Sequence, residues 1–136
     1  MTTTPTQSTQ PSTLDDIATD AGTFAVLAFD QRNTLKRMYA AIGNDAPSAA
    51  EMTALKADVV EALGTAASAF LLDPTYGIPA LDQVSEAVRK QLGVLVAAEP
   101  AERQKFEGEP RGTLDPALDA AWVLSLIHIS EPTRPY

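Results

Sequence analysis

Hydrophobic residues form three short continuous runs along the chain, and longer stretches with helical spacing lie between them. The runs are residues 23–29, 68–72 and 93–97. None of them alternates with polar residues, which is typical of strands that are buried on both faces beneath covering helices. The pattern therefore predicts three strands of one parallel sheet.

Residues that typically cap and terminate helices predict helices on either side of the first run. A short helix is expected over residues 14–20, because Thr13 can cap it and Gly22 can end it. The sequence Ser48-Ala-Ala-Glu51 is a capping box, which predicts a long helix to about residue 66. The apolar stripe expected along this long helix is Met52, Leu55, Val59 and Leu63.

The remaining segments complete an alternating order of strands and helices. Helices are also predicted at residues 35–42, 81–88 and 114–123, and the charged segment 99–113 is predicted to be a loop. Such alternation indicates βαβ units, and either a doubly wound open sheet or a (β/α)8 barrel fits it. No G-x-G-x-x-G loop follows the first run, which disfavours a dinucleotide-binding sheet.

Composition excludes several classes of function. The net charge is −8, there is no cysteine, and the single histidine is His128. An acidic chain without a basic stripe binds nucleic acid poorly. No apolar run approaches the ~20 residues that a membrane span needs. We therefore expect no nucleic-acid partner, no membrane partner, no metal site and a cytoplasmic location.

The two ends of the chain differ in composition from its middle. Residues 1–12 are almost entirely Thr, Ser, Pro and Gln, so a disordered leader is predicted. Residues 124–134 read Leu-Ser-Leu-Ile-His-Ile-Ser-Glu-Pro-Thr-Arg, which is identical to an in-frame translation of a transposase-end sequencing adapter. We interpret residues 124–136 as adapter-derived and expect residues 13–123 to be a fragment of a longer protein.

Each apolar run is followed by polar or acidic residues. Asp30 and Gln31 follow the first run, Asp73 the second and Glu99 the third. The carboxyl ends of barrel strands carry the active site, so these side chains are predicted to converge on one pocket mouth. The structural alternatives are that Asp30 caps the next helix, Asp73 forms an Asx turn before Pro74, and Glu99 is a solvated loop charge.

The basic residues are better explained by structure than by chemistry. Arg32 is expected to pair with a neighbouring acid rather than with a substrate. A Schiff-base lysine requires a desolvated pocket. The lysines all fall on predicted helices or in the charged loop, where a solvated surface explains each of them: Lys36, Lys56, Lys90 and Lys105.

Two motifs resemble the tagatose-bisphosphate aldolase family, which includes the sulfofructose-phosphate aldolases. They are Ala-Phe-Asp-Gln-Arg at 28–32 and Leu-Leu-Asp-Pro-Thr-Tyr-Gly at 71–77, and the run at 93–97 fits the family's third strand. The resemblance extends over residues 14–98. It implies a class I, metal-independent aldolase without a cofactor, built on a (β/α)8 TIM barrel. This α/β chain would carry about three βα units of that barrel and be truncated there.

The resemblance also implies a reaction and a few residue roles. Family members cleave a ketose phosphate, such as tagatose 1,6-bisphosphate or sulfofructose 1-phosphate, to dihydroxyacetone phosphate and an aldehyde. Asp30 and Gln31 match substrate-binding positions, and Asp73 and Glu99 are candidates for the rim of the site. The Schiff-base lysine lies on the sixth strand, so this chain is expected to hold no catalytic residue and to be inactive.

Two alternatives to an aldolase remain open from the sequence. The longer protein could be a sugar-phosphate-binding sensor barrel, or residues 13–123 could be a small α/β interaction domain. The longer protein is also a candidate homo-oligomer.

Overall fold

A computed structural model describes residues 13–102 and 104–119 of the chain. The predicted disordered leader at residues 1–12 and the adapter-derived tail at 124–136 lie outside the described residues. Residues 120–123 of the last predicted helix also lie outside them.

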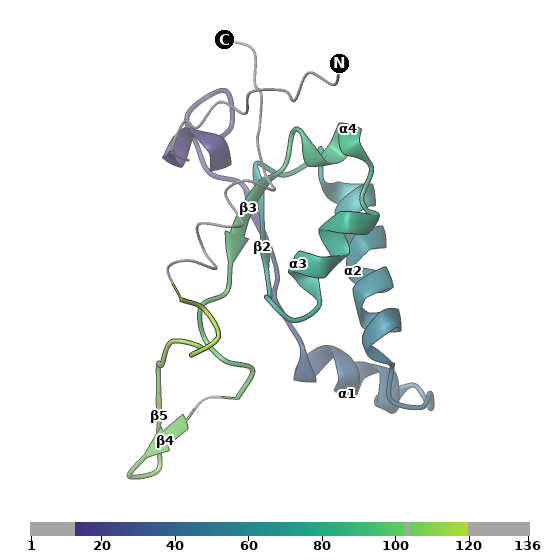
Figure 1. Cartoon of the computed structure of the whole chain (residues 1–136), viewed down its shortest axis with the longest axis vertical. Coiled ribbons are helices and arrows are strands. Elements are labelled where there is room, and N and C mark those ends of the chain that lie inside the picture. The colour runs from purple at the N-terminus through teal and green to yellow at the C-terminus, as the bar shows by residue number, and fades with distance from the viewer. Residues whose placement is uncertain (1–12, 103, 120–136) are drawn as a thin grey trace, which may run out of the picture.

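Three parallel strands form the central sheet, as the apolar runs predict. They are β1 (Val26–Phe29), β2 (Ala69–Leu72) and β3 (Gly93–Val96), and they lie in the order β1-β2-β3. The register pairs Phe29 with Leu72 and Leu72 with Val96, so the three strands end at the same edge of the sheet (Figure 1). The mixed α/β class is therefore confirmed, and a parallel sheet of this order is compatible with part of a barrel.

The helical segments within residues 49–89 pack on one face of this sheet, whereas the short N-terminal helical turn at residues 14–17 lies on the other side of the strands (Figure 1). The helical elements are η1 (Leu14–Ile17), α1 (Asn33–Ala41), α2 (Ala49–Leu63), α3 (Gly77–Ala80), η2 (Leu81–Gln83) and α4 (Glu86–Arg89). Phe70 and Leu72 of β2 are fully buried against this layer. The core contains Ala57, Val60, Phe70, Leu72, Ala80, Leu81, Val84, Val88 and Leu92. None of the helices in the described part of the chain is long and apolar enough to cross a membrane.

The capping box at the start of α2 is confirmed. The Ser48 hydroxyl accepts a hydrogen bond from the Glu51 backbone N–H at 3.2 Å, and the Ser48 N–H donates to Glu51 Oε2 at 2.8 Å. These bonds satisfy two backbone donors that the first turn of a helix leaves free. The helix ends at Leu63, somewhat before the expected end near residue 66.

The buried face of α2 differs from the predicted apolar stripe. Residues Met52, Lys56 and Val60 form the buried row, together with Ala57. Leu63, which the prediction placed in the stripe, is 41% exposed. Met52 is buried as predicted, and Val59 packs against the core. The prediction was wrong for Leu63, because a lysine interrupts the buried row of residues spaced four apart and the apolar pattern was traced along the neighbouring row.

The first strand is covered on one face only, which corrects the expectation of burial on both faces. Leu27 and Phe29 pack against the core, whereas Val26 is 41% exposed and Ala28 is also exposed. Successive side chains of a strand point to opposite faces. The helices therefore cover the face of Leu27 and Phe29, and the face of Val26 and Ala28 is left open.

The helix predicted over residues 81–88 is divided into two short pieces. Element η2 ends at Gln83, and Val84 is extended, with φ −84° and ψ 141°. Ser85 then caps α4, its hydroxyl accepting from the Val88 N–H at 3.4 Å. A serine that can cap a new helix competes with continuation of the old one, so the apolar spacing alone gave the wrong boundaries.

The segment predicted as a loop contains a β-hairpin, which extends away from the sheet (Figure 1). Its antiparallel strands are β4 (Gln104–Phe106) and β5 (Glu109–Arg111). Glu107 and Gly108 both have positive φ, 51° and 87°, as a two-residue type I′ turn requires.

Residues 114–119 do not form the start of a helix, contrary to the prediction. Asp115 folds the chain into a turn instead, because its Oδ1 accepts from the Ala117 N–H at 2.9 Å. Its own N–H donates to the Ala98 carbonyl at 2.7 Å. These bonds return the chain to the end of β3 after the hairpin.

Candidate functional site

A polar cleft of about 570 Å³ lies at the carboxyl ends of β1 and β3. Asp30 and Gln31 line it from the end of β1, and Glu99 lines it from the end of β3. The geometry that the sequence predicts for these three residues is thus present. The other lining residues are Arg32, Asn33, Thr34, Arg37, Ala97, Pro100, Ala101 and Glu102.

Asp30 does not serve as the cap of the helix that follows it. Helix α1 has Arg32 at its N-cap position, and no side chain makes a capping hydrogen bond there. Asp30 and Gln31 instead occupy the short connection between β1 and α1. Asp30 is therefore not the helix cap of the structural alternative, and it lines the cleft.

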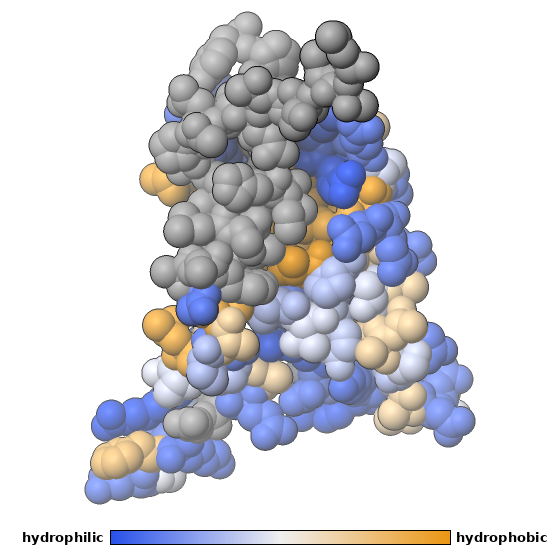
Figure 2. All heavy atoms as spheres, in the orientation of Figure 1, coloured by the Kyte–Doolittle hydropathy of each residue, from blue (hydrophilic) through white to orange (hydrophobic). Residues whose placement is uncertain are grey.

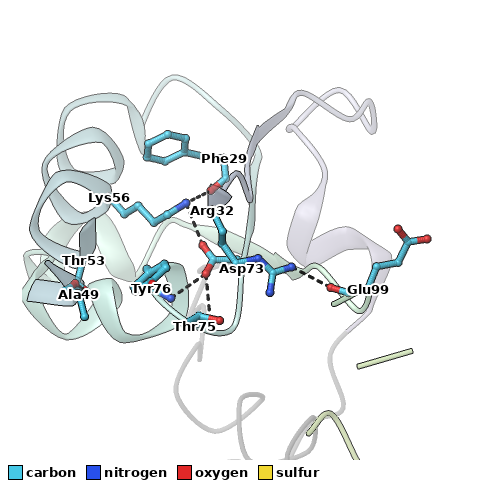
Figure 3. Close-up of polar contacts among 9 residues, drawn as sticks. All are labelled: Phe29, Arg32, Ala49, Thr53, Lys56, Asp73, Thr75, Tyr76 and Glu99. Carbon is cyan, nitrogen blue, oxygen red and sulfur yellow. Dashed lines mark hydrogen bonds and ion pairs between the residues drawn. The ribbon is translucent and has the colours of Figure 1, made fainter. Parts of the chain in front are cut away.

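Arg32 ties the two sides of the cleft together. Its Nη2 donates a hydrogen bond to the backbone carbonyl of Glu99 at 2.9 Å (Figure 3). This bond goes to the main chain of Glu99, whereas the sequence predicts an ion pair of Arg32 with the carboxylate of a neighbouring acid. The bond joins the β1–α1 connection to the segment after β3, which are the two sides of the cleft.

Asp73 lies at the end of β2 but does not line the cleft. Its side chain is fully buried, and its Oδ2 accepts from the N–H groups of Thr75 at 3.1 Å and Tyr76 at 2.8 Å. This is the Asx turn that the structural alternative describes. Gly77 follows because a Cβ there would lie 3.1 Å from Asp73 Oδ1 and 2.8 Å from Leu72 Cβ.

Lys56 is the residue whose environment the sequence analysis missed. Its side chain is fully buried, so the expected solvated surface is wrong for this lysine. Its Nζ lies 2.9 Å from Asp73 Oδ1 and donates to the Phe29 carbonyl at 2.7 Å (Figure 3). The available signal was its spacing, since Lys56 lies four residues from both Met52 and Val60.

The cleft presents hydrogen-bonding and charged groups of both signs. Its lining residues include the acidic Asp30, Glu99 and Glu102 and the basic Arg32 and Arg37. A mixed lining of this kind suits a polyhydroxylated, anionic molecule better than an apolar one. Among the described residues, no group of three His, Asp or Glu side chains could hold a metal ion.

A parallel sheet with a polar cleft at its carboxyl edge is the arrangement of many α/β enzymes. Comparison with known proteins identifies several similar proteins that have the same name. Tagatose 1,6-diphosphate aldolases of Staphylococcus aureus strains JH9, Newman and JH1 are each 41% identical to the chain over 88 residues. The match covers 65% of this chain and 26% of each relative. No family model matches the chain.

These relatives confirm the resemblance to the tagatose-bisphosphate aldolase family. The chain spans about a quarter of the length of the curated relatives it matches. The similarity therefore applies to a part of such a protein.

Proposed function

We propose that the longer protein to which residues 13–123 belong is a class I aldolase. Its substrate would be a ketose phosphate such as tagatose 1,6-bisphosphate or sulfofructose 1-phosphate, and its products dihydroxyacetone phosphate and an aldehyde. The observation that carries this proposal is the shared cleft of Asp30, Gln31 and Glu99. The names of the relatives support it independently.

The proposed architecture is a (β/α)8 TIM barrel, of which this chain carries about three βα units. Its support is that three parallel strands follow one another in the sheet in the order of the sequence. A barrel of this class needs eight strands and about 250 residues, with its site at the carboxyl ends of the strands. The cleft has that location.

Asp30 and Gln31 would orient the substrate in this proposal. The Asp30 carboxylate can accept hydrogen bonds from sugar hydroxyls, and the Gln31 amide can both donate and accept them. A lysine amine elsewhere in the longer protein would attack the ketose carbonyl and, with loss of water, form an iminium. The iminium would accept the electron pair released when the carbon–carbon bond breaks, and no metal or other cofactor is required.

The 136-residue chain itself is proposed to be inactive, because it holds no lysine that lines the cleft among its described residues. Residues 124–136 are proposed to derive from a sequencing adapter. Amplifying and sequencing the source DNA across the codons for Ala121 to Leu124 tests this directly. A reading frame that continues past Val123 without the adapter supports the proposal, and a genomic copy of Leu124–Tyr136 contradicts it.

A hybrid enzyme tests the activity. Residues 14–98 replace the matching segment of a Staphylococcus aureus tagatose 1,6-diphosphate aldolase, and cleavage of both candidate substrates is measured. Borohydride reduction with dihydroxyacetone phosphate should add a stable mass to the hybrid, because it traps the iminium. We expect Asp30→Ala to lower kcat/KM by roughly 100-fold, as loss of a substrate-orienting group does, and the surface variant Asp58→Asn to leave it unchanged.

The outcomes of this experiment separate the candidate functions. A folded hybrid that cleaves neither substrate contradicts the aldolase proposal. Binding of a sugar phosphate without cleavage would favour the sensor barrel instead. A cytoplasmic location and assembly into a homo-oligomer are also proposed for the longer protein, and fractionation of the source cells followed by size-exclusion chromatography tests both.

A further inference from the structure

The buried pair of Lys56 and Asp73 lies directly behind the candidate site. Lys56 Nζ reaches from α2 to the Phe29 carbonyl, which belongs to the residue immediately before Asp30. The same Nζ lies 4.3 Å from the centre of the Phe29 ring. Lys56 therefore holds both the main chain and the side chain of the last residue of β1.

The pair also fixes the neighbouring strand. Phe29 pairs with Leu72 in the sheet, and Asp73 follows Leu72. While Asp73 Oδ1 faces Lys56 Nζ, Asp73 Oδ2 accepts the N–H groups of Thr75 and Tyr76. One ammonium group thus connects the end of β1, the end of β2 and the turn into α3.

Stability alone does not account for a charged pair in this place. Removing two charges from water is expensive, and hydrophobic replacements of similar volume are often neutral or stabilising. An ion pair does, however, fix direction and distance, which a hydrophobic contact does not. The functional residues nearest to it in the sequence are Asp30 and Gln31, which line the cleft.

We propose that Lys56, held by Asp73, is a positioning residue for Asp30 and Gln31. By holding the Phe29 carbonyl, it sets the direction in which the chain leaves β1, and so the place of both side chains in the cleft. Lys56 itself does not line the cleft and acts through the main chain. This inference rests on the proposed function, in which Asp30 and Gln31 contact the substrate.

The test uses the full 136-residue chain with ¹⁵N and ¹³C labels. Dihydroxyacetone phosphate is titrated in, and the amide signals of Asp30 and Gln31 report its binding. The informative variant is Lys56→Met combined with Asp73→Asn, which removes both charges and keeps an amide oxygen for Thr75 and Tyr76. Lys90→Met is the matched control, because Lys90 is exposed and forms an ion pair with the exposed Glu86 at 2.7 Å.

We expect the double variant to unfold at nearly the same urea concentration as the parent chain and to lose about tenfold in affinity. The ¹³C signal of the Phe29 carbonyl should also shift in the double variant, because Lys56 no longer donates a hydrogen bond to it. Lys90→Met should change neither the urea midpoint nor the affinity for dihydroxyacetone phosphate. A double variant that binds as tightly as the parent overturns the proposal, and so does one that fails to fold, since the pair is then structural.

Failure of the proposed function gives a different result. If the parent chain shows no binding at Asp30 or Gln31, the substrate role of these residues is contradicted. The carbonyl and amide signals of Phe29, Asp30 and Gln31 then decide the positioning role. Signals that are the same in the double variant and the parent overturn it, and displaced signals at these residues alone support it.

Discussion

Lys56 and Asp73 show how two charged side chains can occupy the interior of a small sheet protein. Each side chain is fully buried, and each meets a partner of opposite charge as well as backbone groups. The Phe29 ring adds a face with which a cation interacts favourably. Both charges are therefore compensated, as interior charges must be.

Removal of one member of this pair should be far more harmful than removal of both. Lys56→Met leaves the Asp73 carboxylate buried without its cation, and we expect the free energy of unfolding to fall by roughly 3–5 kcal/mol. Urea denaturation followed by circular dichroism measures this, with Lys90→Met as the exposed control. A loss below about 1 kcal/mol, the range of exposed pairs, would mean that Asp73 is not buried as described.

Gly93 is required by a close approach of three chain segments at the start of β3. A Cβ at this position would lie 2.6 Å from the Ser68 carbonyl oxygen and 2.7 Å from the Asp16 carbonyl oxygen. Both are backbone atoms, which cannot rotate away, so Gly93→Ala should destabilise the chain by about 1–3 kcal/mol.

Gly112→Ala is the matched control for this substitution. Its Cβ would lie 3.2 Å from Glu99 Oε1, the end of a flexible side chain that can move aside. The midpoints of urea denaturation of the two variants should therefore differ clearly. Equal midpoints would show that the approach at Gly93 is looser than the structure has it.

At the scale of elements, Glu61 joins α2 to the start of α4. Its carboxylate accepts from the Ser85 N–H and the Ser85 hydroxyl, both at 2.7 Å. These hydrogen bonds, the backbone one first, lower the pKa of Glu61 below its usual value of 4.5. The Ser85 hydroxyl also caps the N-terminus of α4. One side chain therefore starts α4 and links it to α2.

The lowered pKa of Glu61 predicts the sign of a pH dependence. A carboxyl group with a lower pKa in the folded chain stabilises it above the unfolded pKa, and this contribution is lost as the pH falls through the folded value. Glu61→Gln should therefore be less stable than the parent at pH 7, and the gap should narrow as the pH falls below 4.5. The urea midpoints of the parent and of Glu61→Gln at a series of pH values measure this difference in stability. A gap that is constant between pH 7 and the acid limit contradicts the assignment.

At the scale of the whole molecule, strand β1 has one covered face and one open face. Val26 and Ala28 point to the open face, and β1 and β3 each have one neighbouring strand in this sheet. Figure 2 shows further hydrophobic surface in the middle of the view and at the end that carries β4 and β5. Open sheet edges and apolar faces favour association with other chains.

This surface predicts self-association of the chain. We expect the sedimentation coefficient to rise with concentration, and Ala28→Lys to reduce the rise because it places a charge on the open face of β1. Ala62→Lys adds the same charge on an exposed position of α2 and should have little effect. A chain that stays monomeric at every concentration would show that this face is covered in solution.

The sequence by itself determined the three parallel strands and their succession along the chain, and the capping box of α2. It also determined the motifs at the ends of β1 and β2 and the place of Asp30, Gln31 and Glu99 at the carboxyl ends of the strands. These features are local, since they depend on continuous apolar runs, caps and the residues that directly follow a strand. Tertiary structure alone decided that Lys56 is buried, that Ser85 starts a new helix, and that a hairpin interrupts the segment after β3. Each of these depends on a distant partner: Asp73 for Lys56, Glu61 for Ser85, and Ala98, which binds Asp115, for the return of the hairpin segment. The hydropathy pattern along a chain does not report which distant residues a side chain contacts. A lysine that pairs with a buried aspartate therefore cannot be distinguished by sequence pattern from a lysine exposed to water.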